Sequence, residues 1–177
     1  TRVQFQITKS HSMSLDKRAT ECIYTYMIKL DDTQMQQSAM DLSTCTCANL
    51  RKAARVVTKV YDVALQPSGL KATQFTVLAT LAKRGDAPLT RLAEVLVMDR
   101  TTLTRNLKPL VRRGLIRIEQ EADQRVRKVS LTTNGQNLLD AARPGWEQAQ
   151  SRIVESLGHG RWVGFLEDLA TTVAVVR

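Results

Sequence analysis

The strongest constraint on the fold is the order of elements predicted between residues 89 and 132. A short amphipathic segment at 90–96 is followed, after a break, by a second amphipathic segment at 99–113. Two segments of alternating apolar and polar residues, 115–119 and 127–131, then flank an Arg-rich tip. This order predicts a helix-turn-helix followed by a β-hairpin wing, which places one helix in the DNA major groove. The sequence therefore favours a DNA-binding regulator over an enzyme.

Apolar residues at intervals of three and four predict helices elsewhere in the chain. They cover about 46–65, 73–83 and 133–157, and a last apolar helix follows a break at Gly158-His159-Gly160. The fold class is therefore mainly α with a small β-hairpin wing, a winged helix-turn-helix with further helices at both ends. Side-chain N-caps are predicted at Thr90, at Asp99, and at Thr132 or Thr133.

The chain is expected to fold as one domain with an N-terminal extension. Residues 1–13 end in Ser-His-Ser-Met, which is typical of an expression-tag remnant, so we expect them to lie outside the fold. Residues 14–45 are predicted to form an N-terminal arm or helix, and 46–177 a single domain. No apolar run approaches the roughly 20 residues that a bilayer span needs, and no secretory segment opens the chain. The sequence therefore predicts a cytoplasmic protein without a membrane partner.

The positive charge is concentrated in the middle of the chain. The formal net charge is +9, and residues 89–132 carry ten Lys or Arg against five Asp or Glu. Residues 51–88 carry seven against two, whereas the last 35 residues are neutral. This distribution is typical of a surface that binds a polyanion, although a basic face kept for solubility is the alternative.

The helix predicted at 99–113 has one apolar and one basic face. On a helical wheel Leu103, Leu107 and Leu110 fall together, and the opposite face carries hydroxyls and cations but no acid. Arg can form paired hydrogen bonds with guanine and Thr can contact a base edge or a thymine methyl, whereas an ordinary solvated helix would carry acids as well. The candidate DNA contacts on this helix are Arg100, Thr101, Thr102, Thr104, Arg105, Lys108 and Arg112.

The wing tip supplies the second set of candidate DNA contacts: Asp123, Arg125, Arg127 and Lys128. A basic hairpin tip can lie along the DNA backbone or insert an Arg into a narrow minor groove. Asp123 is predicted either to hold Arg125 extended through a salt bridge or to serve only as a turn residue.

These motifs together resemble the MarR family of bacterial transcription regulators. Asp123-x-Arg125 followed by Val-Ser-Leu-Thr at 129–132 is similar to the wing of that family. The run 100–107 with Leu110 and Gly114-Leu-Ile resembles its recognition helix and first wing strand, and the similarity covers roughly residues 45–157.

The resemblance implies a homodimeric repressor that binds double-stranded DNA at a pseudo-palindromic operator. It implies that 46–66 and 133–177 are dimerisation helices and that 71–132 form the winged helix-turn-helix. A small aromatic effector or an oxidant would release the protein from DNA.

Four residues are candidates for effector or redox sensing: Cys47, Arg51, Arg55 and Tyr61. The segment from Cys47 to Tyr61 is similar to the first helix of organic-hydroperoxide sensors in the family, in which a Cys at this position is oxidised. Arg51 stands where those sensors carry a tyrosine, and a nearby cation can lower a thiol pKa. The alternatives are an aromatic-acid site that uses Arg51, Arg55 and Tyr61, or Cys45 and Cys47 as small apolar residues.

Enzymatic function has little support in the sequence. We find no Gly-rich phosphate loop, no His or Cys set with metal-ligand spacing and no candidate triad, so no cofactor is expected. A winged-helix module that docks another protein or RNA is the alternative function.

Overall fold

The computed structural model describes residues 42–120 and 127–176. The predicted tag remnant and most of the predicted N-terminal arm, residues 14–45, therefore lie outside the described residues. The chain divides into two compact units, residues 1–53 and 54–177, and the boundary falls inside the first described helix. Within the described residues no helix has both the length and the apolar character that a membrane crossing requires.

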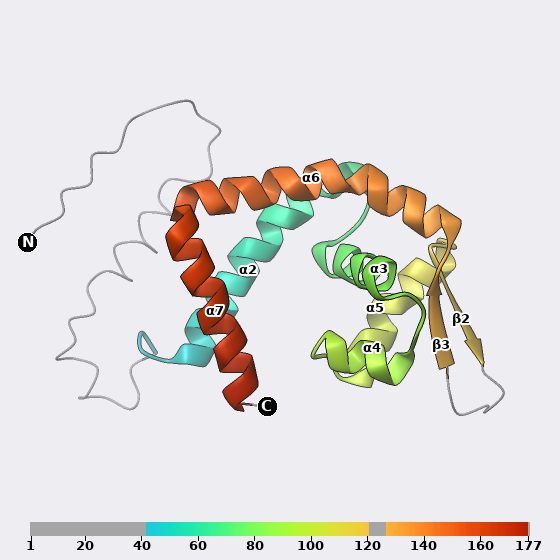
Figure 1. Cartoon of the computed structure of the whole chain (residues 1–177), viewed down its shortest axis with the longest axis horizontal. Coiled ribbons are helices and arrows are strands. Elements are labelled where there is room, and N and C mark those ends of the chain that lie inside the picture. The colour runs from blue at the N-terminus through green and yellow to red at the C-terminus, as the bar shows by residue number, and fades with distance from the viewer. Residues whose placement is uncertain (1–41, 121–126, 177) are drawn as a thin grey trace, which may run out of the picture. The chain divides into compact units, whose positions relative to one another are not determined.

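Within residues 42–120, four α-helices and a short 3₁₀ helix precede the hairpin, and the bounds of the α-helices are close to those predicted (Figure 1). The helix α2 spans Thr46–Ala64, the short 3₁₀ helix η1 spans Gln66–Ser68 and α3 spans Ala72–Arg84. The helix-turn-helix consists of α4, Leu89–Val95, and α5, Arg100–Arg112. The break before α3 is Pro67-Ser68-Gly69, as the sequence predicts, and Gly69 has φ of +65°.

The wing is an antiparallel hairpin of β2, Ile116–Gln120, and β3, Arg127–Leu131, which lie side by side (Figure 1). A two-residue strand, β1 (Ala87–Pro88), pairs with the other edge of β3, so the sheet order is β1-β3-β2. Strand β1 was not predicted, because two residues carry no periodicity and their partners, Val129 and Lys128, are distant in sequence.

Two long helices complete the second unit: α6 spans Thr133–Leu157 and α7 spans His159–Val176. Thr132 caps α6 by accepting a hydrogen bond from the Gly135 N–H at 3.0 Å. The break between the two helices is shorter than predicted, because Gly158 alone, at φ of +80°, ends α6.

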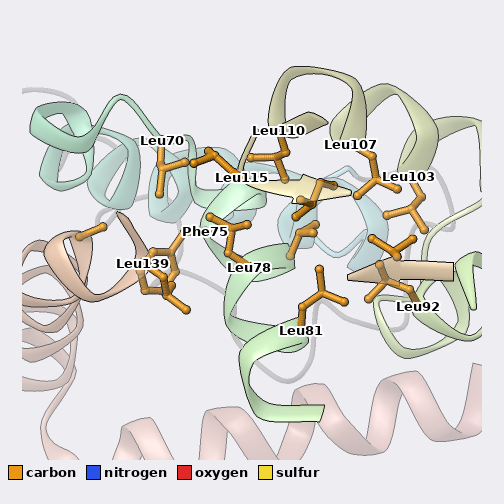
Figure 2. Packing of buried hydrophobic residues seen from close by; sticks show 14 of the residues in the cluster. Leu70, Phe75, Leu78, Leu81, Leu92, Leu103, Leu107, Leu110, Leu115 and Leu139 are labelled. Atoms are coloured by element: carbon orange, nitrogen blue, oxygen red, sulfur yellow. The ribbon is translucent and has the colours of Figure 1, made fainter. Parts of the chain in front are cut away.

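One apolar core holds the helix-turn-helix against α3 and the start of the hairpin (Figure 2). Leucines from α3, α4 and α5 point toward one another in it, together with Leu115 and Ile116 at the start of β2. The residues that lose nearly all solvent contact include Leu65, Leu70, Val77, Leu78, Leu92, Leu103, Leu107, Leu110, Ile116 and Val129. Burial of a large aliphatic side chain contributes about 1.5–3 kcal/mol, so this core fixes the orientation of α5.

Candidate nucleic-acid interface

The N-terminus of α5 is held by Asp99, the cap that the sequence predicts. The Asp99 carboxylate accepts hydrogen bonds from the Thr102 N–H at 2.8 Å and from the Thr102 hydroxyl at 2.6 Å. These bonds, the hydroxyl first, hold the pKa of Asp99 below its usual value. Asp99 therefore stays ionised at neutral pH and fixes the first turn of α5.

The orientation of α5 divides its side chains as the helical wheel predicts. Leu103, Leu107 and Leu110 point into the core (Figure 2) and are at most 1% exposed. Five of the seven candidate contacts are exposed with side chains that form no cap in the structure: Arg100, Thr101, Arg105, Lys108 and Arg112. The α5 sequence contains no acid. Thr101, Arg105, Lys108 and Arg112 lie on the side of the helix opposite the leucines. Arg100 is exposed in the first turn.

The two other candidates on α5 already serve the helix itself. The Thr102 hydroxyl donates to Asp99, and the half-exposed Thr104 hydroxyl donates to the Arg100 carbonyl at 2.7 Å. Both hydroxyl protons are used in these bonds, so each oxygen can only accept a hydrogen bond from a group outside the chain.

The predicted cap of α4 is wrong. Thr90 lies in the first turn of the helix, and the N-cap is Pro88, at φ −56°, without a side-chain hydrogen bond. The proline ring restricts φ to about this value even in the unfolded chain, and proline has no N–H that needs a hydrogen-bond partner. The helix therefore starts two residues earlier than it would with Thr90 as the N-cap.

The turn between α4 and α5 contains a residue with an unusual backbone. Val97 has φ of +52° and a side chain that is 59% exposed. It lines an open depression of about 400 Å³ between α4 and the start of α5, together with Thr90, Glu94, Met98 and Arg100 among others. Val97 was not among the predicted site residues, because its only signal in the sequence is a β-branched residue where a helix must end.

The wing is described only in part. Asp123 and Arg125 lie outside the described residues, so the structure does not place them. Arg127 is exposed on β3. Lys128 is half-buried, and its Nζ lies 3.0 Å from an Asp86 carboxylate oxygen in the segment before β1.

The Asp86–Lys128 pair changes the role of one predicted contact. The Lys128 ammonium, then the Ser130 hydroxyl, hold the pKa of Asp86 below its usual value. Part of the Lys128 charge is thus compensated within the chain, and the pair ties the β1 segment to the middle strand of the sheet.

Two further arginines near the interface were not among the predicted contacts. Arg117 is exposed on β2, where it pairs with Glu119 at 3.3 Å. Arg113 donates to the carbonyl oxygens of Gly69 at 2.9 Å and Ser68 at 3.2 Å, so it holds the loop before α3. The outward position of Arg117 follows from strand alternation, whereas the Arg113 contact joins residues 44 apart and leaves no local signal.

The four sensing candidates lie along α2. Cys47 and Arg51 belong to the first unit and are exposed, and Cys45 and Cys47 are free thiols. Arg55 and Tyr61 belong to the second unit, in which Arg55 is exposed.

Tyr61 is part of an aromatic stack that joins three helices. Its ring lies 6.3 Å from that of Trp146 on α6, which in turn lies 5.9 Å from that of Phe75 on α3. The Tyr61 hydroxyl donates to Oε1 of Gln150, and burial raises the pKa of the phenol. Tyr61 therefore already serves packing in the second unit, and its hydroxyl is engaged.

Within residues 42–120 and 127–176 no three His, Cys, Asp or Glu side chains gather in a way that could hold a metal ion.

Comparison with known proteins agrees with this geometry. The protein-family model described as "MarR family" matches residues 70–126 of this chain. A crystal structure of the M. tuberculosis transcriptional regulator MosR in complex with DNA is similar at 36% identity with a TM-score of 0.67. That match covers 75% of this chain and 98% of the MosR chain.

Two more distant relatives point to the same class of protein. BpsR of Bordetella bronchiseptica, whose DNA binding is regulated by 6-hydroxynicotinic acid, is 26% identical with a TM-score of 0.64. The match covers 70% of this chain and 95% of BpsR. YhbI of Bacillus subtilis (strain 168), an uncharacterised HTH-type transcriptional regulator, is 27% identical over 100 residues. Those residues are 56% of this chain and 65% of YhbI, less than two thirds of that relative's length.

Proposed function

This chain belongs to the MarR family of transcription regulators, and we propose that it acts as a homodimeric repressor on a pseudo-palindromic operator. In this proposal α5 enters the major groove and the β2–β3 wing contacts the DNA backbone or the minor groove. The family and the similar solved structures are regulators rather than enzymes.

The observation that carries the proposal is the division of α5 into two faces. One face is held in the core by three buried leucines, and the other presents Arg105, Lys108 and Arg112 without an acid. A rigid helix with this charge neutralises phosphates, and its Arg and Thr side chains can read base edges. MosR, at 36% identity over nearly its whole chain, has been crystallised with DNA.

The homodimer is supported by apolar surface that the described residues leave uncovered. No residue of α7 is buried, although Phe165, Leu166 and Val173 are 42%, 43% and 47% exposed. A second copy that covers this surface would also supply a second α5, and two recognition helices one DNA turn apart bind a palindrome far more tightly than one.

An effector that releases the protein from DNA is the finer part of the proposal. BpsR responds to an aromatic acid, which favours an effector of that class for this chain, and the exposed Arg55 of the second unit offers a cation for its carboxylate. An oxidant is the alternative, since Cys47 is an exposed free thiol on α2.

The first experiment is a titration of the purified protein against fragments of its own upstream region, in moderate salt with competitor DNA. We expect saturable binding of two chains to one fragment and an affinity that falls steeply with salt. Arg105→Ala should weaken operator binding about 10- to 100-fold, as loss of a paired contact to guanine does. Arg152→Ala removes the same charge from an exposed position on α6 and serves as the matched control.

Equal, weak binding of every fragment would contradict the proposal and favour a module that docks protein or RNA. Equal effects of Arg105→Ala and Arg152→Ala would contradict the assignment of α5.

The effector proposal has its own test. The DNA complex is titrated with an organic hydroperoxide and, separately, with a hydroxylated aromatic acid. Cys47→Ser should abolish the response to the hydroperoxide and leave the response to the acid. A Cys47→Ser protein that responds to the hydroperoxide as the wild type does would overturn the redox role of Cys47.

A further inference from the structure

The turn between α4 and α5 is built on a residue that is poorly suited to its backbone. Val97 is the one non-glycine residue with positive φ among the described residues, at +52°. A β-branched side chain in this region contacts its own backbone closely, and such residues persist where the surrounding structure or the function requires them.

The hydrogen bonds show why the backbone is left-handed here. The Met98 N–H donates to the Ala93 carbonyl at 2.9 Å, and the Val97 N–H donates to the Glu94 carbonyl at 3.2 Å. This pair of bonds is the Schellman motif that ends many helices, and its left-handed position is usually glycine. Both bonds use backbone atoms only, so glycine at position 97 would form them without the steric cost.

The fold gains little from the Val97 side chain. Its neighbours Leu96 and Met98 pack against the core, whereas Val97 is 59% exposed and does not contribute to the core cluster. Among the described residues the isopropyl group therefore has no place in the core.

The position of Val97 indicates what lies outside. It lines the open depression beside Arg100, the first residue of α5, and lies two residues before the cap Asp99. In helix-turn-helix proteins the N-terminal residues of the recognition helix approach the DNA most closely. Glu94 and Asp99 also line the depression, and their carboxylates disfavour a phosphate there, so an apolar group at this point is suited to the carbon-rich face of a deoxyribose.

We propose that Val97 is a further DNA-contact residue, whose isopropyl group packs on a deoxyribose of the operator backbone and sets how deeply α5 enters the groove. The inference rests on the proposed DNA-binding role of α5.

The test uses the full chain with Val97→Gly and Val97→Ala, in thermal unfolding and in operator titrations at several salt concentrations. Val97→Gly should unfold about 2–4 °C higher than the wild type, because the backbone strain is removed. It should also bind the operator about fivefold more weakly, as loss of buried apolar surface predicts. The dependence of affinity on salt should not change, because no charge is lost.

Val97→Ala separates loss of the contact from loss of rigidity. It keeps a restricted backbone but lacks the isopropyl group, so it should bind as weakly as Val97→Gly. Wild-type affinity in Val97→Ala, or in Val97→Gly, would overturn the inference. A lower unfolding temperature for Val97→Gly would also overturn it, since the side chain would then serve the fold.

Arg105→Ala in the same titration separates this inference from the proposed function. A wild type without a preferred operator overturns both. If the wild type binds and Arg105→Ala weakens binding while both Val97 variants bind normally, only the role of Val97 fails.

Discussion

At the base of the wing the backbone of α6 approaches that of the hairpin so closely that it leaves no room for a side chain at Gly135. Gly135, in the first turn of α6, is buried against the start of β2. A Cβ atom built on Gly135 would lie 2.0 Å from the Leu115 carbonyl oxygen and 2.7 Å from a Leu131 methyl carbon. The Leu115 oxygen also accepts the Thr132 N–H at 3.1 Å, so it cannot move away without breaking that bond.

We therefore expect Gly135→Ala to destabilise the protein by about 2 kcal/mol. Overpacking costs about 1–3 kcal/mol, and a contact with backbone belongs at the upper end of that range. Alanine is about 1 kcal/mol more favourable than glycine inside a helix, so the net destabilisation is about 2 kcal/mol. For a domain of this size the melting temperature should fall by about 4–8 °C.

The assay is thermal unfolding followed by circular dichroism at fixed protein concentration. Gly160→Ala is the matched control, because Gly160 is an exposed helical glycine with no atom within 4 Å of an added Cβ. The control should melt at or slightly above the wild-type temperature. A Gly135→Ala protein that melts with the control would refute the reasoning, since helix propensity would then outweigh the contact.

Three further predictions concern the supports of α5 and of the aromatic stack. Arg113→Ala should lower the melting temperature by about 2–4 °C, because two carbonyl partners lose their donor, while the salt dependence of DNA binding stays at the wild-type slope. Asp99→Asn should flatten the pH dependence of stability below about pH 4. Because the pKa of Asp99 is lowered in the folded state, its carboxylate stabilises the fold at pH values above the ordinary pKa of 3.8. That stabilisation is lost as the pH falls through the folded-state pKa. Unfolding curves from pH 3 to pH 6 measure this, and parallel profiles for variant and wild type would contradict it. Tyr61→Phe should melt about 2–4 °C lower, because Gln150 loses its donor while the ring stack persists, and an unchanged melting temperature would show that the hydrogen bond adds nothing.

Most of the secondary structure follows from local pattern, because each predicted segment is long enough to show its period. The α5 helix is the clearest case: its cap, its leucine face and its basic face all follow from spacing, and the structure agrees on each. The wing strands were predicted within a residue for the same reason.

What the sequence did not predict depends on contacts between residues far apart. Strand β1 exists only because Val129 offers an edge 42 residues later, and Lys128 is engaged because Asp86 lies beside that edge. Candidate DNA contacts were chosen by charge, and charge alone does not reveal which cations already have an acidic neighbour. The left-handed backbone at Val97 is hidden for a related reason, since the hydrogen bonds that impose it depend on where α4 ends.

The helix α6 connects two contacts that lie well apart along its length. Near its start Gly135 rests on the base of the wing, and Gln150 farther along holds the hydroxyl of Tyr61. Fifteen residues of helix separate them, which is about 22 Å. If α6, which contains Pro144 between these contacts, tilts as one body by about 10° at the Tyr61 end, the wing base moves through roughly 4 Å. A small change in packing around Tyr61 is therefore geometrically sufficient to take the wing out of register with a DNA groove.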